Sequence, residues 1–73
     1  MQYEVKITID DDIKYEKDKA TIYEASNALN EHLSDFKHID IPSILSDAEE
    51  VGLSACRCAK KNPVIYYWIS KIS

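Results

Sequence analysis

The segment from Val64 to Ile72, Val-Ile-Tyr-Tyr-Trp-Ile-Ser-Lys-Ile, constrains the fold more than any other part of the sequence. Its β-branched and aromatic residues predict a strand. Side chains of a strand alternate between two faces. Here one face carries Val64, Tyr66, Trp68 and Ile72, and the other carries Ile65, Tyr67 and Ile69. A strand that is apolar on both faces lies in the centre of a sheet, or a partner covers its far side.

The length of the chain limits how such a strand can be covered. Its 73 residues are expected to form a single domain, residues 1–73. A domain of this size buries only about 60% of the surface of its unfolded chain, so it must pack efficiently or bind a partner. A second copy, bound as a homodimer through the C-terminal strand, is one such partner. The two cysteines are too few for a secreted disulfide framework.

The sequence shows no targeting or membrane segment. No apolar run approaches the ~18 residues of a membrane-spanning helix. The start, Met1-Gln2-Tyr3-Glu4, lacks the basic and apolar regions of a signal peptide. We therefore expect a cytoplasmic protein without membrane contact.

The first part of the chain predicts a β-hairpin. Apolar residues alternate with polar ones from Gln2 to Ile9, as in a half-buried strand. Asp10-Asp11-Asp12 predicts a turn, and Ile13 and Tyr15 resume the alternation in a return strand that ends near Lys17. The three aspartates could also hold a metal ion. Because no glycine and no later glutamate complete a calcium loop, a solvated turn is favoured.

Two helices are predicted after the hairpin. Thr21 and Glu24 form a capping box, and an apolar stripe at helical spacing indicates a helix from about Ile22 to Phe36. A second helix begins at Asp40 or Ile41 with Pro42 in its first turn. Its end is predicted at Gly52, the only glycine, with Leu53 placed for the apolar contact of a Schellman motif.

The last part predicts a second hairpin. Residues 53–59 form one strand, Lys60-Lys61-Asn62-Pro63 forms the turn, and residues 64–72 form the other strand. The predicted fold class is therefore α+β: an N-terminal β-hairpin, two helices and a C-terminal β-hairpin. Whether the two hairpins join in one sheet is left open.

This C-terminal part resembles a winged helix-turn-helix domain, in which a helix ends at Gly-Leu and a basic turn connects two strands, the second rich in tyrosine. The matching stretches run from Ala48 to Leu53, from Cys56 to Asn62 and from Val64 to Ile69. The resemblance covers roughly the last 33 residues and implies DNA binding. It implies that the second helix would be the recognition helix and that residues 53–72 would be the wing.

The charge pattern departs from that family. A recognition helix needs Arg, Lys, Asn or Gln on its outer face, whereas the second helix offers Ser43, Ser46, Asp47, Glu49 and Glu50. All thirteen acidic residues lie within residues 1–52, and residues 53–73 carry no acid. Only the wing could contact phosphate. The cationic residues of the wing are Arg57, Lys60, Lys61 and Lys71.

Catalytic and metal-binding patterns are missing from the sequence. One glycine cannot form a phosphate-binding loop, and no motif places a base beside a nucleophile. Cys56 and Cys58 share one face of a strand and could bind zinc together with His32 and His38, but the usual zinc-knuckle spacing is absent. Two reduced thiols packed against the helices are favoured. We therefore expect a protein that is not an enzyme and holds no cofactor or metal.

The sequence thus favours a small protein–protein interaction module, a regulator or inhibitor of a larger machine of the kind that phages and plasmids encode. Its partner would present a basic surface to Asp35, Asp47, Glu49 and Glu50, with Tyr66, Tyr67 and Trp68 as the apolar anchor. The alternative is a DNA-binding regulator that contacts DNA weakly through the wing. A mimic of nucleic acid is less favoured, because a net charge of −4 is modest.

Overall fold

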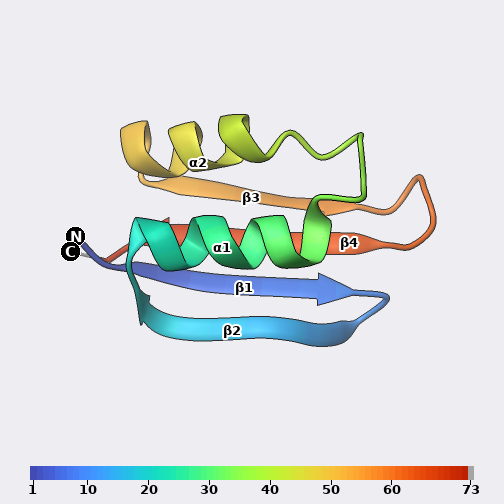
Figure 1. The fold of residues 1–73 in the computed structure, drawn as a ribbon, viewed down its shortest axis with the longest axis horizontal. Coiled ribbons are helices and arrows are strands. Elements are labelled where there is room, and N and C mark those ends of the chain that lie inside the picture. The colour runs from blue at the N-terminus through green and yellow to red at the C-terminus, as the bar shows by residue number, and fades with distance from the viewer. Residues whose placement is uncertain (73) are drawn as a thin grey trace.

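The structure, a computed structural model, describes residues 1–72 and shows one four-stranded sheet with two helices on one of its faces (Figure 1). The chain order is β1 (Tyr3–Ile9), β2 (Asp12–Ala20), α1 (Ile22–Leu33), α2 (Ile41–Glu50), β3 (Leu53–Cys58) and β4 (Ile65–Lys71). The spatial order is β2-β1-β4-β3, and all neighbours are antiparallel. The predicted α+β class and the hairpin–helix–helix–hairpin order are confirmed.

Strand β4 lies in the centre of the sheet, which explains why both of its faces are apolar. It pairs with β1 on one side and with β3 on the other, so the two hairpins form a single sheet. Ile65 and Ile69 are fully buried under the helices, and Tyr67 packs against that core. Because both edges of β4 are occupied, a homodimer through this strand could use only its outer face.

The first hairpin is longer than expected. Its turn residues Asp10 and Asp11 both have positive φ angles, 51° and 68°, the geometry of the type I′ turns that suit a hairpin. Strand β2 ends at Ala20 rather than near Lys17. It contains extra residues at two irregularities of its register with β1, and its last residue, Ala20, pairs with Tyr3. The Asp10 carboxylate also accepts a hydrogen bond from the Val64 N–H at 2.9 Å, which connects this turn to the start of β4.

Helix α1 begins as predicted and ends earlier. Both hydrogen bonds of the Thr21–Glu24 capping box are present. The helix ends at Leu33, not at Phe36. Phe36 lies in the turn that follows, where its N–H donates to the Leu33 carbonyl at 3.1 Å. Its side chain still packs against the core. The apolar spacing therefore continues past the last helical residue.

Helix α2 is bounded by the predicted caps, with one difference. The Asp40 side chain accepts from the Ser43 N–H at 3.2 Å, and Gly52 has a φ angle of 90°. The Gly52 N–H donates to the Ala48 carbonyl at 3.1 Å, which is the simpler αL motif and not the Schellman motif. Leu53 already belongs to β3 and is 45% exposed, so it lacks the expected role of an apolar contact within the cap.

The core lies between the sheet and the helices. It consists mainly of aliphatic side chains, with alanines on both helices that let the helices approach the sheet closely. The largest fully buried side chains are Val5, Ile7, Leu29, Leu33, Ile65 and Ile69. Within the described residues, neither helix has the length and apolar character needed to cross a membrane.

Candidate functional site: a surface at the end with the chain termini

The acidic residues of α2 are exposed, as the sequence predicts. The buried residues of this helix are Ile41, Ile44 and Ala48, and Asp47, Glu49 and Glu50 are exposed to solvent. Among residues 1–72, the ion pairs join Lys6 to Glu16, Lys17 to Glu24 and, when His32 is protonated, His32 to Glu31. The carboxylates of α2 therefore have no cationic partner within this part of the chain.

Glu49 and Glu50 also lie at an unfavourable position of the helix. They occupy its last turn, where the helix dipole is negative, and that turn contains no basic residue. Such a carboxylate costs about 0.3–1 kcal/mol of stability. The Lys71 ammonium group, which donates to the Glu49 carbonyl at 3.4 Å, offsets part of this cost.

Exposed apolar side chains gather around the same end of α2. Val51 is 76% exposed directly after the helix, and Tyr23 is 79% exposed in the first turn of α1. The chain termini lie at this end of the molecule (Figure 1). Among residues 1–72, five of the six exposed large hydrophobic residues belong to segments that begin or end here: Met1, Tyr23, Val51, Leu53 and Ile72. The sixth, Ile13, lies on β2 near the opposite end.

Backbone hydrogen bonds and a cavity bring these segments together at one end of the molecule. The Lys71 N–H donates to the Gly52 carbonyl at 2.8 Å, and the Ile72 N–H donates to the Gln2 carbonyl at 2.9 Å. A cavity of about 360 Å³ lies at this end, lined by Met1, Tyr3, Thr21, Ile22, Tyr23 and Glu49. We call the set Met1, Tyr23, Glu49, Glu50 and Val51 the terminal surface, whereas Leu53 and Ile72 lie on the open face of the sheet at the same end.

The remaining residues that the sequence predicts to bind a protein partner lie in different parts of the molecule. Asp35 follows α1 at the end opposite to the terminal surface, because α1 and α2 run in opposite directions (Figure 1). A ten-residue helix such as α2 is about 15 Å long, so Asp35 is far from Glu49 and Glu50. Tyr67 faces the helices, whereas Tyr66 and Trp68 face the open side of the sheet.

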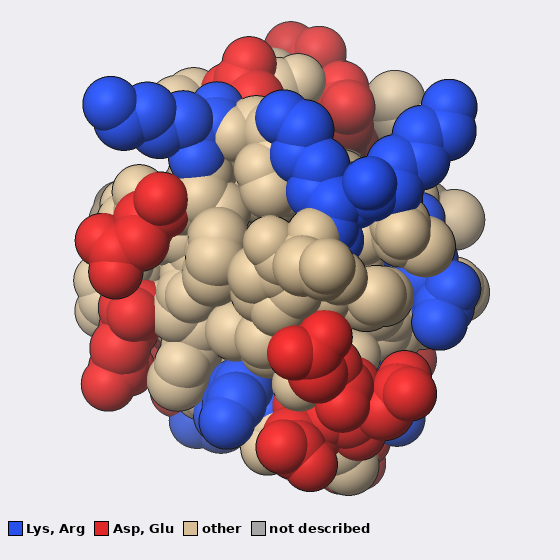
Figure 2. All heavy atoms as spheres, turned by 90° about the vertical axis from the view of Figure 1, so that its right-hand side faces the viewer, with Lys and Arg blue, Asp and Glu red and all other residues tan. Residues whose placement is uncertain are grey.

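The basic residues that the sequence predicts to contact nucleic acid also lie at two different ends of the molecule. Arg57, Lys60 and Lys61 line a cavity of about 280 Å³ with His38 and Cys58, at the end of the molecule away from the terminal surface. Figure 2 shows this end, with Lys and Arg side chains projecting from its upper part and an acidic group below them. Lys71 lies at the other end of β4, beside Glu49, and does not join this group.

The open face of the sheet carries a depression of about 330 Å³. Its lining includes Glu4, Lys6, Glu16, Asp18, Tyr66 and Trp68. The Trp68 indole N–H donates to Glu4 Oε1 at 3.0 Å, and Lys6 Nζ lies 3.7 Å from Glu16 Oε2. Sequence reasoning missed this site, because it depends on the pairing of β1 with β4, in which Lys6 lies opposite Trp68.

The cysteines share one face of β3, but they are less buried than expected. Their Sγ atoms lie 3.5 Å apart, Cys56 is exposed and Cys58 is half-buried. Burial, followed by the contact with Cys56, raises the pKa of the Cys58 thiol. Burial, followed by the negative charges that Cys56, Cys58 and Asp47 can carry, raises the pKa of Tyr67.

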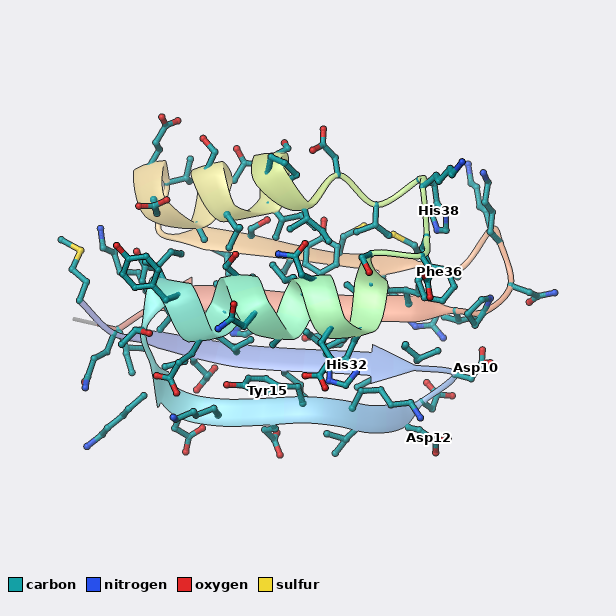
Figure 3. All side chains as sticks on the ribbon, in the orientation of Figure 1. Asp10, Asp12, Tyr15, His32, Phe36 and His38 are labelled. Carbon is teal, nitrogen blue, oxygen red and sulfur yellow. The ribbon has the colours of Figure 1, made fainter. Side chains whose placement is uncertain are left out.

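The two histidines lie in different places (Figure 3). His32 is on α1 beside Glu31, and His38 follows α1 and packs edge-on against Phe36 with ring centroids 6.3 Å apart. Within residues 1–72, no three His, Cys, Asp or Glu side chains are placed to hold a metal ion.

The comparisons with known proteins gave no match to a protein-family model, a curated protein or a solved structure. The winged-helix resemblance therefore stays a prediction, and the function has to be argued from the surface of this chain.

Proposed function

We propose that this chain is a small non-enzymatic protein–protein interaction module, and that its terminal surface binds a partner protein with a basic surface. The observation that carries the proposal is that the exposed residues Met1 and Tyr23 line one cavity with Glu49, while the exposed Val51 directly follows Glu50. Stable interfaces combine a desolvated apolar centre with a polar rim. Here Tyr23 and Val51 would supply the centre, and the two glutamates would supply an acidic rim that selects a basic partner.

The electrostatics of α2 support this assignment. Two carboxylates in the last turn of a helix reduce its stability, and no cation within residues 1–72 pairs with either of them. Residues that act against local stability are expected at functional sites. A basic partner would supply the missing counter-charge. A module of 73 residues that works in this way would act as a regulator or inhibitor of a larger machine.

Affinity capture from the native host tests the proposal. The tagged wild-type chain is compared with Asp47→Lys/Glu49→Lys/Glu50→Lys, and captured proteins are identified by quantitative mass spectrometry. We expect the variant to recover about tenfold less of a partner with a basic surface, because three attractive charges become repulsive. The matched control, Asp12→Lys/Glu31→Lys/Asp35→Lys, makes the same change in net charge outside the terminal surface and should retain capture.

A second pair of variants tests the apolar centre. Tyr23→Ser/Val51→Ser should weaken capture, whereas Ile13→Ser changes an exposed apolar residue away from the terminal surface and should leave capture unchanged. Capture that survives both the charge reversal and Tyr23→Ser/Val51→Ser would contradict the proposal. Equal losses in the control variants would attribute binding to net charge or general hydrophobicity and would also contradict it.

DNA binding through the β3–β4 hairpin is the second candidate function. It is favoured by the grouping of Arg57, Lys60 and Lys61 around one cavity at the end shown in Figure 2. Three phosphate contacts would make affinity fall about 40-fold between 50 and 200 mM salt. A gel-shift titration should therefore show binding at about 50 mM salt that weakens in Lys60→Ala/Lys61→Ala. No retardation at this low salt would reject the candidate.

A further inference from the structure

The depression on the open face of the sheet combines two aromatic rings with a net negative lining. Tyr66 and Trp68 are half-buried neighbours on the outer side of β4. The depression is also lined by three carboxylates, those of Glu4, Glu16 and Asp18, and by one ammonium group, that of Lys6. Arg57 lies outside the lining, opposite Tyr66 in the pairing of β3 with β4, so the Trp68 side of the depression is the more negative one. Aromatic faces attract cations through their electron-rich π systems, and carboxylates attract them through charge. The lining therefore suits an organic cation.

The contacts within the depression leave acceptors free for such a ligand. Trp68 uses one oxygen of the Glu4 carboxylate, which fixes the indole and leaves Oε2 able to accept from a cation. Lys6 pairs loosely with Glu16 at 3.7 Å. Asp18 is exposed and forms no ion pair within residues 1–72. The resident Lys6 thus satisfies only part of the negative charge.

The depression also lies close to the terminal surface. In the pairing of β1 with β4, Glu4 lies opposite Ser70, the residue before Lys71. Lys71 in turn contacts the end of α2 through the Glu49 carbonyl. A partner that covers the terminal surface can therefore place one side chain around the edge of the molecule and into the depression.

We propose that the depression binds the guanidinium or ammonium head of an Arg or Lys side chain from the basic partner. This source of the cation rests on the proposed function, whereas the chemistry of the depression does not. The head group lies against the Trp68 ring and donates to Glu4 and Asp18. In this arrangement the positive charge of Lys6 within the same depression repels the ligand, so the removal of Lys6 strengthens binding.

A titration that follows Trp68 tests the inference directly, because this residue is the only tryptophan of the chain. The probes are N-acetyl-arginine methylamide, N-acetyl-lysine methylamide and the neutral analogue N-acetyl-citrulline methylamide. We expect the two cationic probes to change Trp68 fluorescence and its indole N–H resonance saturably, and the citrulline probe to cause no saturable change. A response to citrulline equal to that of arginine would overturn the proposal, as would no saturable response at all.

Three variants assign the site. Glu4→Gln keeps an acceptor for the indole but removes a charge, and it should weaken binding about two- to five-fold, comparable to the energy of one exposed cation contact. Lys6→Met should tighten binding. Asp12→Asn, which neutralises an exposed carboxylate outside the depression, should leave binding unchanged. An equal loss in Asp12→Asn and Glu4→Gln would overturn the site assignment.

Two further comparisons, with free organic cations and with partner capture, identify the source of the cation and show whether this inference or the proposed function has failed. Free guanidinium and tetramethylammonium that bind more tightly than the blocked amino acids would indicate a small-molecule site and overturn the partner side chain as ligand. Partner capture that depends on α2 without any probe binding would refute this inference alone. Probe binding together with capture that ignores the α2 reversal would refute the proposed function instead.

Discussion

Neutralising Glu49 and Glu50 is expected to stabilise the fold while it weakens partner binding. The double variant Glu49→Gln/Glu50→Gln keeps side-chain length and helix propensity nearly constant. Each carboxylate in a last helical turn costs about 0.3–1 kcal/mol, so the two together cost about 0.6–2 kcal/mol. The contact of Lys71 with the Glu49 carbonyl offsets part of the cost. We therefore expect the free energy of unfolding to rise by about 0.5–1 kcal/mol.

Urea unfolding followed by circular dichroism measures this change, and a thermal scan should show a midpoint about 2–8 °C higher for a domain of this size. The control Asp12→Asn/Asp18→Asn neutralises two exposed carboxylates of β2, away from the helix ends. A stability equal to or below that of the wild type in the α2 variant would refute the helix-dipole reasoning. An equal gain in the control would show that net charge is responsible.

Three other predictions concern the core, the ion pair between Lys17 and Glu24 at the start of α1, and the two cysteines. Leu29→Ala should lower the free energy of unfolding by about 2–5 kcal/mol, because the side chain is fully buried, and a smaller loss in urea unfolding would contradict this packing. The hydrogen bond from Lys17, followed by that from the Thr21 N–H, lowers the pKa of Glu24. The stability that the ionised Glu24 carboxylate contributes is therefore present above about pH 4.5 and is lost as the pH falls through the lowered pKa. The difference in unfolding free energy between wild type and Glu24→Gln should therefore shrink from pH 7 to pH 3, and a constant difference would contradict the assignment. Iodoacetamide at pH 8 should alkylate Cys56 before Cys58, because Cys56 is exposed and burial raises the pKa of the Cys58 thiol. Mass spectrometry measures the rate for each cysteine alone in the variants Cys58→Ser and Cys56→Ser, and equal rates would contradict this prediction.

Features fixed by neighbouring residues could be predicted from the sequence. The capping box of Thr21 and Glu24 and the left-handed Gly52 depend on contacts within a few residues, and both are present. The exposure of Asp47, Glu49 and Glu50 follows from helical periodicity in the same way. The end of α1 could not be predicted, because Phe36 contacts the core from a turn and so continues the apolar spacing beyond the helix.

Features that depend on distant pairing could not be predicted. Lys6 and Trp68 become cross-strand neighbours only because β1 pairs with β4, and neither strand shows this register by itself. The terminal surface is similar, since Met1, Tyr23 and Glu49 are far apart in the sequence and line one cavity only in the fold. The predicted partner-binding residues therefore included Glu49 and Glu50 but not the apolar residues beside them.

Site-specific photo-cross-linking in the native host tests most directly whether the terminal surface contacts a basic partner. A photo-reactive phenylalanine analogue replaces Tyr23 in one variant and Ile13, which is 57% exposed on β2 away from this surface, in the other. We expect the Tyr23 position to form a cross-link to a segment rich in Lys and Arg, and the Ile13 position to form none to the same protein. A partner captured from Ile13 and not from Tyr23, or no cross-link from Tyr23, would contradict the account.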